Sequence, residues 1–429
     1  MIDIQSIRFK RTDLFKNKMF KETMWSFATK GMAFGLYFML NIYLARNLGV
    51  EKFGTWSLFF SILSIILLIS YFGINASAMK FIAQYNNTDK LYSVLKSSFK
   101  IRIVLSFGFT LLFFLTYKPL LTFIDRQDLE FLLLISTPLI FLCGLVEFLK
   151  SVFIGLHRVK YNFIITSLEY GLKFGIVVLY TNLAMSFTGI INSYLIATFI
   201  TSLFGIFILY NNFFLHTSNK TDYNLSTEIF RYGIPLFFVS IGFLVATEID
   251  TIMLGLLSTD GEVGVYAVAK QIVIKIPQIS MAIEMGTMPI FAKLNQDNKK
   301  NLKRIFDKLV RANAAVMFFI IIGLLMFSGI LIPLIFGPEY TGSILPLRIL
   351  TLYLGCVSIC VFFNSFLNYQ GLAKKRAINF SIAIVLNIIL NYLLIPSYGA
   401  VGASIATSIS YIPYFVLNWI EVNRVWAHY

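Results

Sequence analysis

Ionisable side chains stand inside long apolar segments of this sequence. The bases are Lys30, Lys173, Lys270, Lys275 and Arg348, and the acids are Glu147, Glu169, Glu248, Asp250 and Glu284. If these segments cross a bilayer, a charge near its centre costs roughly 2.5–3.5 kcal/mol. Such residues therefore face a protein interior or a wet cavity, where bases bind anions and acids bind cations or protons.

Four of the bases are candidates for binding an anionic substrate, namely Lys30, Lys270, Lys275 and Arg348. A phosphate group without partners is prohibitively costly in hydrocarbon, so its passage needs cationic groups in a hydrated cleft. Arg348 follows Pro346 at the start of an apolar segment. It either reaches the cavity or extends to the membrane surface, and the sequence leaves both open.

Three of the acids, Glu248, Asp250 and Glu284, are candidates for lining the cavity or carrying a coupling ion or proton. Glu248 and Asp250 are two residues apart, so they point in different directions from a helix. We expect at most one of them on a given cavity face.

One stripe of residues within 265–291 connects a base with an acid: Lys270, Ile274, Pro277, Met281 and Glu284. Steps of four and three residues place them on one face of a helix. Pro277 would kink this helix and free a carbonyl, so we expect a hinge there. We interpret this face as cavity-lining. The alternative is that Lys270 pairs with Glu248 or Asp250.

The remaining charges are expected to pair locally. Glu169 and Lys173 are one helical turn apart, so they can pair on one helix face. Glu147 lies close to Lys150, and it either pairs with Lys150 or extends to the membrane surface. The sequence has no Gly-rich phosphate loop, no cluster of metal ligands and no nucleophile–base constellation. We therefore expect no enzyme activity, no bound metal and no cofactor, and coupling to a proton or cation gradient is left open.

Composition predicts the elements that position these charges. The 429 residues are 58% hydrophobic and only 13% charged, which excludes a disordered chain. Twelve apolar segments are long enough to span a bilayer, which excludes an ordinary soluble enzyme. The segments are 24–45, 55–78, 103–124, 131–149, 161–182, 186–210, 232–257, 265–291, 312–336, 345–370, 377–396 and 399–420.

Basic residues between the segments predict the orientation. They fall overwhelmingly on one side of the predicted spans, and the exceptions are Arg46, Lys52, Lys118 and Arg126. Cytoplasmic loops carry the excess of Lys and Arg, so both termini are expected in the cytoplasm. The net charge of +15 then indicates basic loops, and we expect no nucleic-acid partner. Residues 1–23 are polar and basic, which predicts a tail and no cleavable signal peptide.

The two halves of the chain repeat a weak pattern. Gly54 and Gly264 each precede an aromatic residue by two positions, and they are about half the chain apart. Two further matches have nearly the same offset: 154–160 with 370–376, and Gly189 with Gly402. Six spans per half give both halves the same orientation, as in parallel repeats around a transport cleft.

This repeat predicts the domain organisation. We expect a basic tail (1–23), an N-lobe (24–210), a cytoplasmic linker (211–231), a C-lobe (232–420) and a second tail (421–429). The expected fold is an all-α polytopic membrane protein of about 12 transmembrane helices, in two pseudo-symmetric six-helix lobes around a central cavity.

Four segments carry a resemblance to a known family: YLARNLGVEKFGTWSL (43–58), MLGLLSTDGEVGVYAVA (253–269), FLNYQGLAKKRAIN (366–379) and IPSYGAVGASIATSIS (395–410). They resemble the bacterial polysaccharide transporter family, and within it the O-antigen or capsule-unit flippases. The family belongs to the multidrug/oligosaccharidyl-lipid/polysaccharide flippase superfamily. The resemblance covers essentially the whole chain.

The resemblance implies a substrate and a cellular location. The substrate would be an undecaprenyl-pyrophosphate-linked oligosaccharide of O-antigen, capsule or exopolysaccharide, flipped from the inner to the outer leaflet of the bacterial plasma (inner) membrane. The implied partners are this lipid-linked oligosaccharide, membrane lipids, a polysaccharide polymerase and a chain-length regulator.

Two other functions are alternatives to a flippase. A cation-coupled drug or small-solute exporter of the same superfamily would favour more acids than bases in the cavity, whereas the membrane-depth charges here are balanced. A membrane-embedded polymerase or glycosyltransferase would need a large extracytoplasmic loop. The longest outer loop is only about 118–130, which argues against that class.

Overall fold

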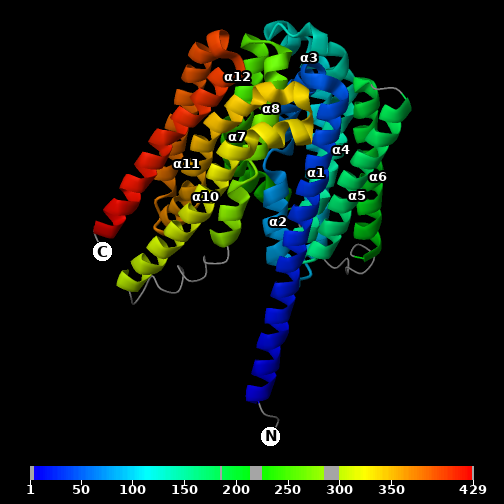
Figure 1. Cartoon of the computed structure of the whole chain (residues 1–429). Coiled ribbons are helices and arrows are strands. Elements are labelled where there is room, and N and C mark those ends of the chain that lie inside the picture. The colour runs from blue at the N-terminus through cyan, green and yellow to red at the C-terminus, as the bar shows by residue number, and fades with distance from the viewer. Residues whose placement is uncertain (1–3, 184–185, 213–224, 285–298, 428–429) are drawn as a thin grey trace. The chain divides into compact units, whose positions relative to one another are not determined.

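The computed structural model describes residues 4–183, 186–212, 225–284 and 299–427 (Figure 1). These residues form helices and turns, with no β-strand among them. Within these ranges, nine helices are long and apolar enough to cross a membrane, by length and composition. The predicted all-α polytopic membrane fold is confirmed. The predicted lobe boundaries stay predictions, and most of the predicted linker 211–231 lies outside the described residues.

The α-helices in chain order are α1 (Ile4–Tyr71), α2 (Ile74–Tyr85), α3 (Leu91–Phe123), α4 (Glu130–Gly155), α5 (Val159–Leu183), α6 (Phe187–Asn212), α7 (Ser226–Leu257), α8 (Asp260–Val273), α10 (Lys299–Phe336), α11 (Ile344–Tyr369) and α12 (Ala373–Ala427). Two 3-10 helices, η1 (Gln127–Leu129) and η3 (Pro338–Ser343), precede α4 and α11.

Two glycines divide the longest helices into pairs of predicted spans. Gly49 in α1 has φ 75° and Gly399 in α12 has φ 50°, and both values lie in the left-handed region that favours glycine. The halves of α12 run side by side, because Asn379 contacts Asn418 and Asn387 contacts Thr407. Residues counted as two spans by hydropathy are therefore joined by a single-residue break.

The predicted span 265–291 is not one uninterrupted helix. α8 ends at Val273, residues 274–276 form a turn, and helix resumes at Pro277. Proline has no backbone N–H to continue the helical hydrogen bonds, so the interruption falls directly before it. The stripe from Lys270 to Glu284 is thus spread over two helical pieces, and 285–291 lies outside the described residues.

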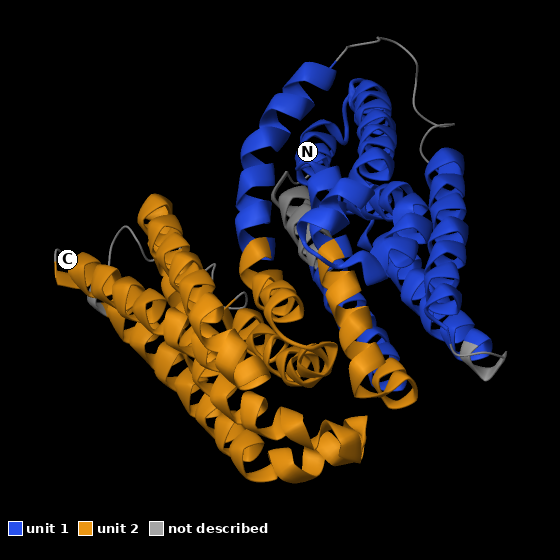
Figure 2. Cartoon of the chain, turned by 90° about the horizontal axis from the view of Figure 1, so that it is seen from above, with its two compact units in different colours: residues 1–43, 63–244 blue, residues 44–62, 245–429 orange. Residues whose placement is uncertain are grey.

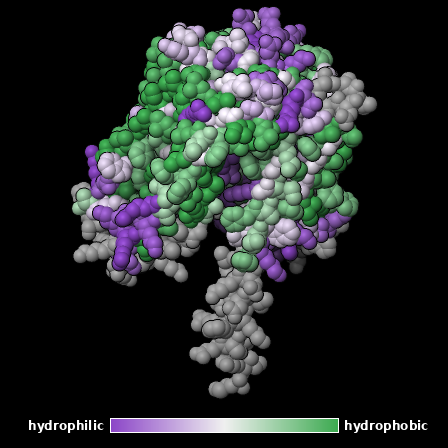
Figure 3. All heavy atoms as spheres, in the orientation of Figure 1, coloured by the Kyte–Doolittle hydropathy of each residue, from purple (hydrophilic) through white to green (hydrophobic). Residues whose placement is uncertain are grey.

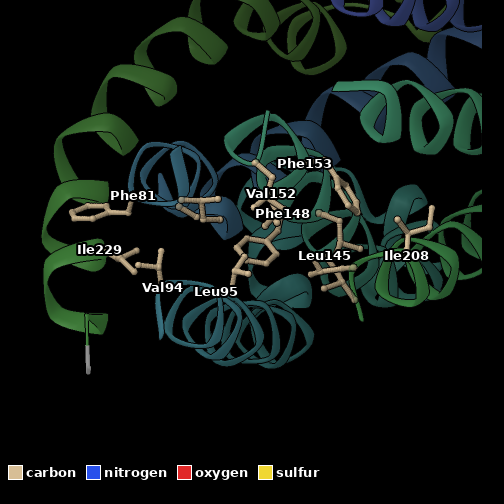
Figure 4. Close-up of a cluster of buried hydrophobic side chains, with 14 of the residues drawn as sticks. Phe81, Val94, Leu95, Leu145, Phe148, Val152, Phe153, Ile208 and Ile229 are labelled. Atoms are coloured by element: carbon tan, nitrogen blue, oxygen red, sulfur yellow. The ribbon is translucent and has the colours of Figure 1, made fainter. Parts of the chain in front are cut away.

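The chain divides into two compact units (Figure 2). Unit 1 comprises Met1–Tyr43 and Leu63–Leu244, and unit 2 comprises Leu44–Ile62 and Val245–Tyr429. In unit 1, a core of buried aliphatic and aromatic side chains joins α2, α3, α4, α5, α6 and α7 (Figure 4). In unit 2, a second apolar core joins α10, α11 and α12.

The repeated glycines pack against each other within unit 2. A Cβ atom on Gly54 would lie 1.7 Å from the Asp260 carbonyl oxygen, and one on Gly264 would lie 2.2 Å from the Val50 carbonyl oxygen. Small residues allow helices to approach this closely. The Thr55 hydroxyl also donates to the Asp260 carboxylate at 2.6 Å. This contact explains why residues 44–62 belong to unit 2.

Large apolar side chains remain exposed on several helices, and they cover much of the face in Figure 3. Phe107 and Leu115 on α3 and Phe319, Met326 and Leu334 on α10 are examples. Contiguous exposed apolar surface of this kind suits contact with lipid. Charged groups placed within these helices must therefore find partners inside the protein.

Candidate functional site

The buried carboxylate of Asp250 is the centre of a polar cluster in unit 2. Asp250 lies on α7 and is only 3% exposed. Its oxygens accept hydrogen bonds from the Tyr266 hydroxyl (2.9 Å), the Thr407 hydroxyl (2.9 Å) and the Asn391 amide (2.7 Å). Across the described ranges, no Lys or Arg forms an ion pair with it. Neutral donors alone hold this buried negative charge.

The side-chain oxygen of Asn391 is an acceptor in this cluster that receives no hydrogen bond. Its amide nitrogen donates to Asp250 and, at 3.0 Å, to the Asn387 side-chain oxygen. Its own side-chain oxygen is buried without a hydrogen-bond partner. Such an orphan acceptor costs about 1–3 kcal/mol. One carboxylate with amide and hydroxyl oxygens is a donor set that suits a small, hard cation.

Lys270 forms a second polar cluster beside the first. Its ammonium donates to the Thr251 hydroxyl at 2.7 Å and to the Glu248 carboxylate at 3.2 Å. The Ser61 hydroxyl donates to the same Glu248 oxygen at 2.8 Å. Of the two interpretations of Lys270, the structure shows pairing with Glu248. Lys270 nevertheless also lines a pocket, so the pairing does not remove it from the candidate site.

A small pocket joins the two clusters. Its lining comprises Ala246, Thr247, Asp250, Tyr266, Lys270, Val273, Ile274, Leu350, Tyr353 and Thr407. All of these residues belong to unit 2. The pocket therefore presents a carboxylate, an ammonium group, two phenols and hydroxyls on an otherwise apolar wall. Such a wall can accept a small polar ligand of either charge.

Local sequence explains how α8 positions this site. Thr259 caps the helix by accepting a hydrogen bond from the Glu262 N–H at 3.3 Å, and Asp260 and Glu262 lie in the first turn. Acids there, and Lys270 in the last turn, match the helix dipole. Tyr266 and Lys270 are four residues apart, so α8 presents both to the pocket.

The other predicted site residues lie elsewhere. Glu284 is buried, and its carboxylate accepts a hydrogen bond from Ser365. Lys275 lies in the turn before Pro277 and interacts electrostatically with Glu248.

Two predicted bases are exposed. Lys30 lies on α1 in unit 1. Arg348 lies on α11, and its guanidinium donates to the Ser328 hydroxyl at 2.9 Å. The structure thus brings Glu248, Lys270 and Lys275 together in unit 2, and it places Lys30 in the other unit.

Unit 1 holds a different network of buried charge. The carboxylate of Glu169 on α5 contacts Lys173 at 2.5 Å and Lys150 of α4 at 2.6 Å. Lys150 also contacts Glu147 at 2.6 Å. The two predicted local pairs are therefore confirmed. They are linked by a contact between helices that was not predicted.

Several buried polar residues were not predicted from the sequence, because they carry no charge or lie at the edge of a predicted span. Tyr266, Asn391 and Thr407 were missed, although Asn387 and Asn391 one turn apart in an apolar segment were a usable signal. Arg102 lies directly before the predicted span 103–124, so it was counted among the basic residues between the spans. The structure buries it completely within α3, where it donates to the Ser70 carbonyl at 3.1 Å.

Two family models match the chain. One, described as "Polysaccharide biosynthesis protein", matches residues 19–295. The other, described as MatE, matches residues 235–393. Both matches include the segment from Glu248 to Lys270.

Individual relatives agree with these matches. The chain is 25% identical over 418 residues to an uncharacterized membrane protein of Methanocaldococcus jannaschii, covering 93% of this chain and 96% of that protein. It is 26% identical over 316 residues to the capsular polysaccharide biosynthesis protein CapF of Staphylococcus aureus, covering 70% and 76%. The probable low-salt glycan biosynthesis flippase Agl15 of Haloferax volcanii is 27% identical over 206 residues, covering 46% and 42%.

Solved structures show the same fold. An inward-facing multidrug resistance MATE family transporter has a TM-score of 0.72 at 14% identity, covering 91% of this chain and 94% of that chain. The lipid II flippase MurJ in an inward closed conformation has a TM-score of 0.68 at 19% identity, covering 94% and 87%. At these identities the likeness concerns the fold alone.

Proposed function

Because the chain belongs to the polysaccharide biosynthesis protein family, we propose that it is a flippase for a lipid-linked oligosaccharide. The substrate would be an undecaprenyl-pyrophosphate-linked repeat unit, moved from the inner to the outer leaflet by alternating access. The observation that carries this proposal is the unit 2 pocket, where Lys270 offers an ammonium group inside the region matched by the family model. CapF and Agl15, named for capsule and glycan biosynthesis, support the substrate class.

In this mechanism Lys270 binds the pyrophosphate. An ammonium group has three N–H donors, and Thr251 and Glu248 take two of them. The third can donate to a phosphate oxygen in the pocket. Tyr353, which also lines the pocket, offers a ring and a hydroxyl for a sugar. Lys275 and Lys30 remain proposed further contacts for the anionic substrate, and the exposed Arg348 is proposed only as a peripheral contact.

We further propose that Asp250 is the coupling site. Its carboxylate, the orphan oxygen of Asn391 and the Thr407 hydroxyl fit a monovalent cation, since a single carboxylate balances a single charge. A bound cation would supply the missing partner of the Asn391 oxygen. Glu248 holds Lys270, Glu284 stays a candidate acid near the hinge, and the helix break before Pro277 is the proposed hinge of α8.

The proposed cellular setting follows from loop charge and family. We place the multi-pass chain in a bacterial plasma membrane with both termini in the cytoplasm, because basic residues gather on one side of the spans. The product would be O-antigen, capsule or exopolysaccharide. A polysaccharide polymerase and a chain-length regulator are the proposed protein partners.

Reconstitution into liposomes tests the flippase. A fluorescent undecaprenyl-pyrophosphate oligosaccharide is added, and its accessibility to a membrane-impermeant quencher is followed over time. Protein-dependent exchange between leaflets, above that of empty liposomes, is the expected result. Folded protein that gives no exchange, with and without an ion gradient, would refute the proposal.

A second candidate is a cation-coupled exporter of drugs or small solutes. The MatE match over 235–393 favours it, because that segment contains Glu248, Asp250 and Lys270. The same liposomes loaded with a cationic dye discriminate the two functions. Gradient-driven dye movement without lipid exchange would favour the exporter.

A further inference from the structure

The guanidinium group of Arg102 is a completely buried cation in unit 1, on a helix long and apolar enough to cross a membrane. Its Nη1 donates to the Ser70 carbonyl at 3.1 Å, and its Cζ lies 5.4 Å from the centre of the Tyr71 ring. Its Nε and Nη2 are buried and have no hydrogen-bond partner among the described residues. Unused donors on a buried cation are costly, so these two nitrogens call for an acceptor.

The unused donors lie close together. Nε and Nη2 form one edge of the guanidinium fork, the edge that binds an anion with two parallel N–H groups. Ser106 follows one turn later on α3, and its hydroxyl is likewise buried without a partner in the described part of the chain. A Cβ atom on Gly144 of α4 would lie 1.8 Å from Arg102 Nη2 and 3.1 Å from Ser106 Oγ. Both groups therefore lie beside the same glycine, whose missing side chain gives them room.

The neighbouring acids do not neutralise Arg102. Glu147 contacts Lys150, and Glu169 contacts both Lys150 and Lys173. These four residues carry two charges of each sign, so they balance one another. Arg102 interacts with Glu147 electrostatically but forms no ion pair across the described ranges. Water could accept from its donors but would leave this excess positive charge in place, whereas an anion would remove it.

We propose that Arg102 and Ser106 bind one small inorganic anion of the size of chloride or bromide. A single negative charge balances the excess, and a halide accepts from the two N–H groups and the hydroxyl at once. Both residues are completely buried, which leaves no exit for the hydrocarbon chain of a lipid phosphate. The ligand is therefore a free ion. The site lies in unit 1 and is separate from the unit 2 pocket of the proposed flippase.

The anion would stabilise a break in the predicted span 55–78. α1 ends at Tyr71 and α2 begins at Ile74. Between them Phe72 has φ 45° and Gly73 has φ 68°, and the left-handed region is unfavourable for phenylalanine. Arg102 binds the Ser70 carbonyl, one of the last in α1, which lacks a partner within the helix. An anion that fixes the guanidinium thus fixes the end of α1, so its binding should stabilise the fold.

Thermal unfolding of the full chain in detergent tests the proposal. Sodium chloride replaces sodium gluconate stepwise, so that sodium concentration and ionic strength stay constant. An anion that binds only the folded chain stabilises it by mass action. We expect the unfolding temperature to rise by about 2 °C or more when chloride has replaced the larger gluconate, and bromide to act like chloride. Equal unfolding temperatures in chloride and gluconate would overturn the proposal.

Variants locate the effect at this site. Arg102→Gln should abolish the chloride dependence, and Ser106→Ala should require about tenfold more chloride for the same rise. The exposed Lys100, two residues before Arg102 on α3, provides the matched control Lys100→Gln, which should retain the full dependence. If Arg102→Gln does not fold, Ser106→Ala decides. An unchanged chloride dependence in folded Arg102→Gln or in Ser106→Ala would contradict the assignment.

Bromide shows the position of the ion directly. Crystals of the full chain grown in sodium bromide should give an anomalous scattering peak beside Arg102 Nε and Nη2. No peak there would refute the site even if chloride raised the unfolding temperature, since the stabilising ion would then bind elsewhere or water alone would serve these donors. Neither measurement involves transport, so the anion site and the flippase function are tested separately.

Discussion

The two units handle buried charge in different ways. In unit 1, Glu169 is shared by Lys150 and Lys173, so each charge is neutralised by a charge of opposite sign. In unit 2, Asp250 is held by hydroxyl and amide groups, and the Asn391 oxygen beside it has no donor. Ion pairs fix the unit 1 network in one arrangement. Neutral donors leave unit 2 with a negative charge that a cation can still balance.

The contrast indicates which network is structural and which is open to a ligand. A carboxylate with two bound ammonium groups offers little to a third partner. The pocket reaches Asp250 and Lys270 but is lined by no residue of unit 1. A charge at membrane depth is therefore weak evidence of function by itself. Whether the charged group is paired with an opposite charge or held by neutral donors is more informative.

The largest expected effect is on the stability of unit 1. Glu169→Gln leaves Lys173 without its carboxylate, and breaking a buried ion pair typically costs about 3–5 kcal/mol. We expect a clear fall in the thermal unfolding temperature of the detergent-solubilised protein. Glu147→Gln is the control, because the Glu147 side chain is 39% exposed. Unfolding of Glu169→Gln at the temperature of the unmodified protein would show that the network is not structural.

Close packing of the repeated glycines should have the next largest effect. Gly54→Ala places a Cβ atom 1.7 Å from the Asp260 carbonyl oxygen, so backbone must move. Overpacking of this kind costs about 1–3 kcal/mol. Thermal unfolding measures the loss, and Gly31→Ala is the control because a Cβ there meets nothing within 4 Å. Equal stability of both variants would argue against a tight contact in unit 2.

Lys270→Ala should separate function from stability. We expect about a tenfold or greater fall in the rate of leaflet exchange, equivalent to about 1.4 kcal/mol, because the ammonium donor to the substrate is lost. The thermal unfolding temperature should fall less than in Lys173→Ala, whose partner Glu169 is only 4% exposed. Normal transport by well-folded Lys270→Ala would remove α8 from the binding site. Lys374→Ala controls for the loss of a basic residue.

Arg348→Ala should have the smallest effect of the four. The Arg348 side chain is exposed and its guanidinium contacts only the Ser328 hydroxyl among the described residues. We expect a transport rate within about twofold of the unmodified protein and a stability change within about 0.5 kcal/mol. A tenfold loss of transport would instead place Arg348 among the substrate contacts, as the sequence first suggested.

Helix breaks were only partly predictable. Hydropathy separated the two halves of α1 and of α12, but it did not identify Gly49 and Gly399 as the single residues that join them. Pro277 predicted a kink, and in the structure the helix is interrupted by a non-helical turn at residues 274–276, directly before Pro277. Local sequence shows where a helix weakens. Packing decides how far the chain departs from helical geometry.

The sequence by itself determined what depends on neighbours along one helix. Apolar runs long enough to span a bilayer predicted the polytopic fold, and the four-residue step from Glu169 to Lys173 predicted their pair. Such features follow from helix geometry, which is the same wherever the helix lies.

Only the tertiary structure decided which distant residues share a site. Asp250 meets Asn391 and Thr407 across 141 and 157 residues of sequence, and Lys150 meets Glu169 across two helices. Neutral Asn and Thr carry no charge that would mark them in an apolar segment. Their role arises because the low-dielectric interior must satisfy a buried carboxylate with whichever donors the packed helices bring to it.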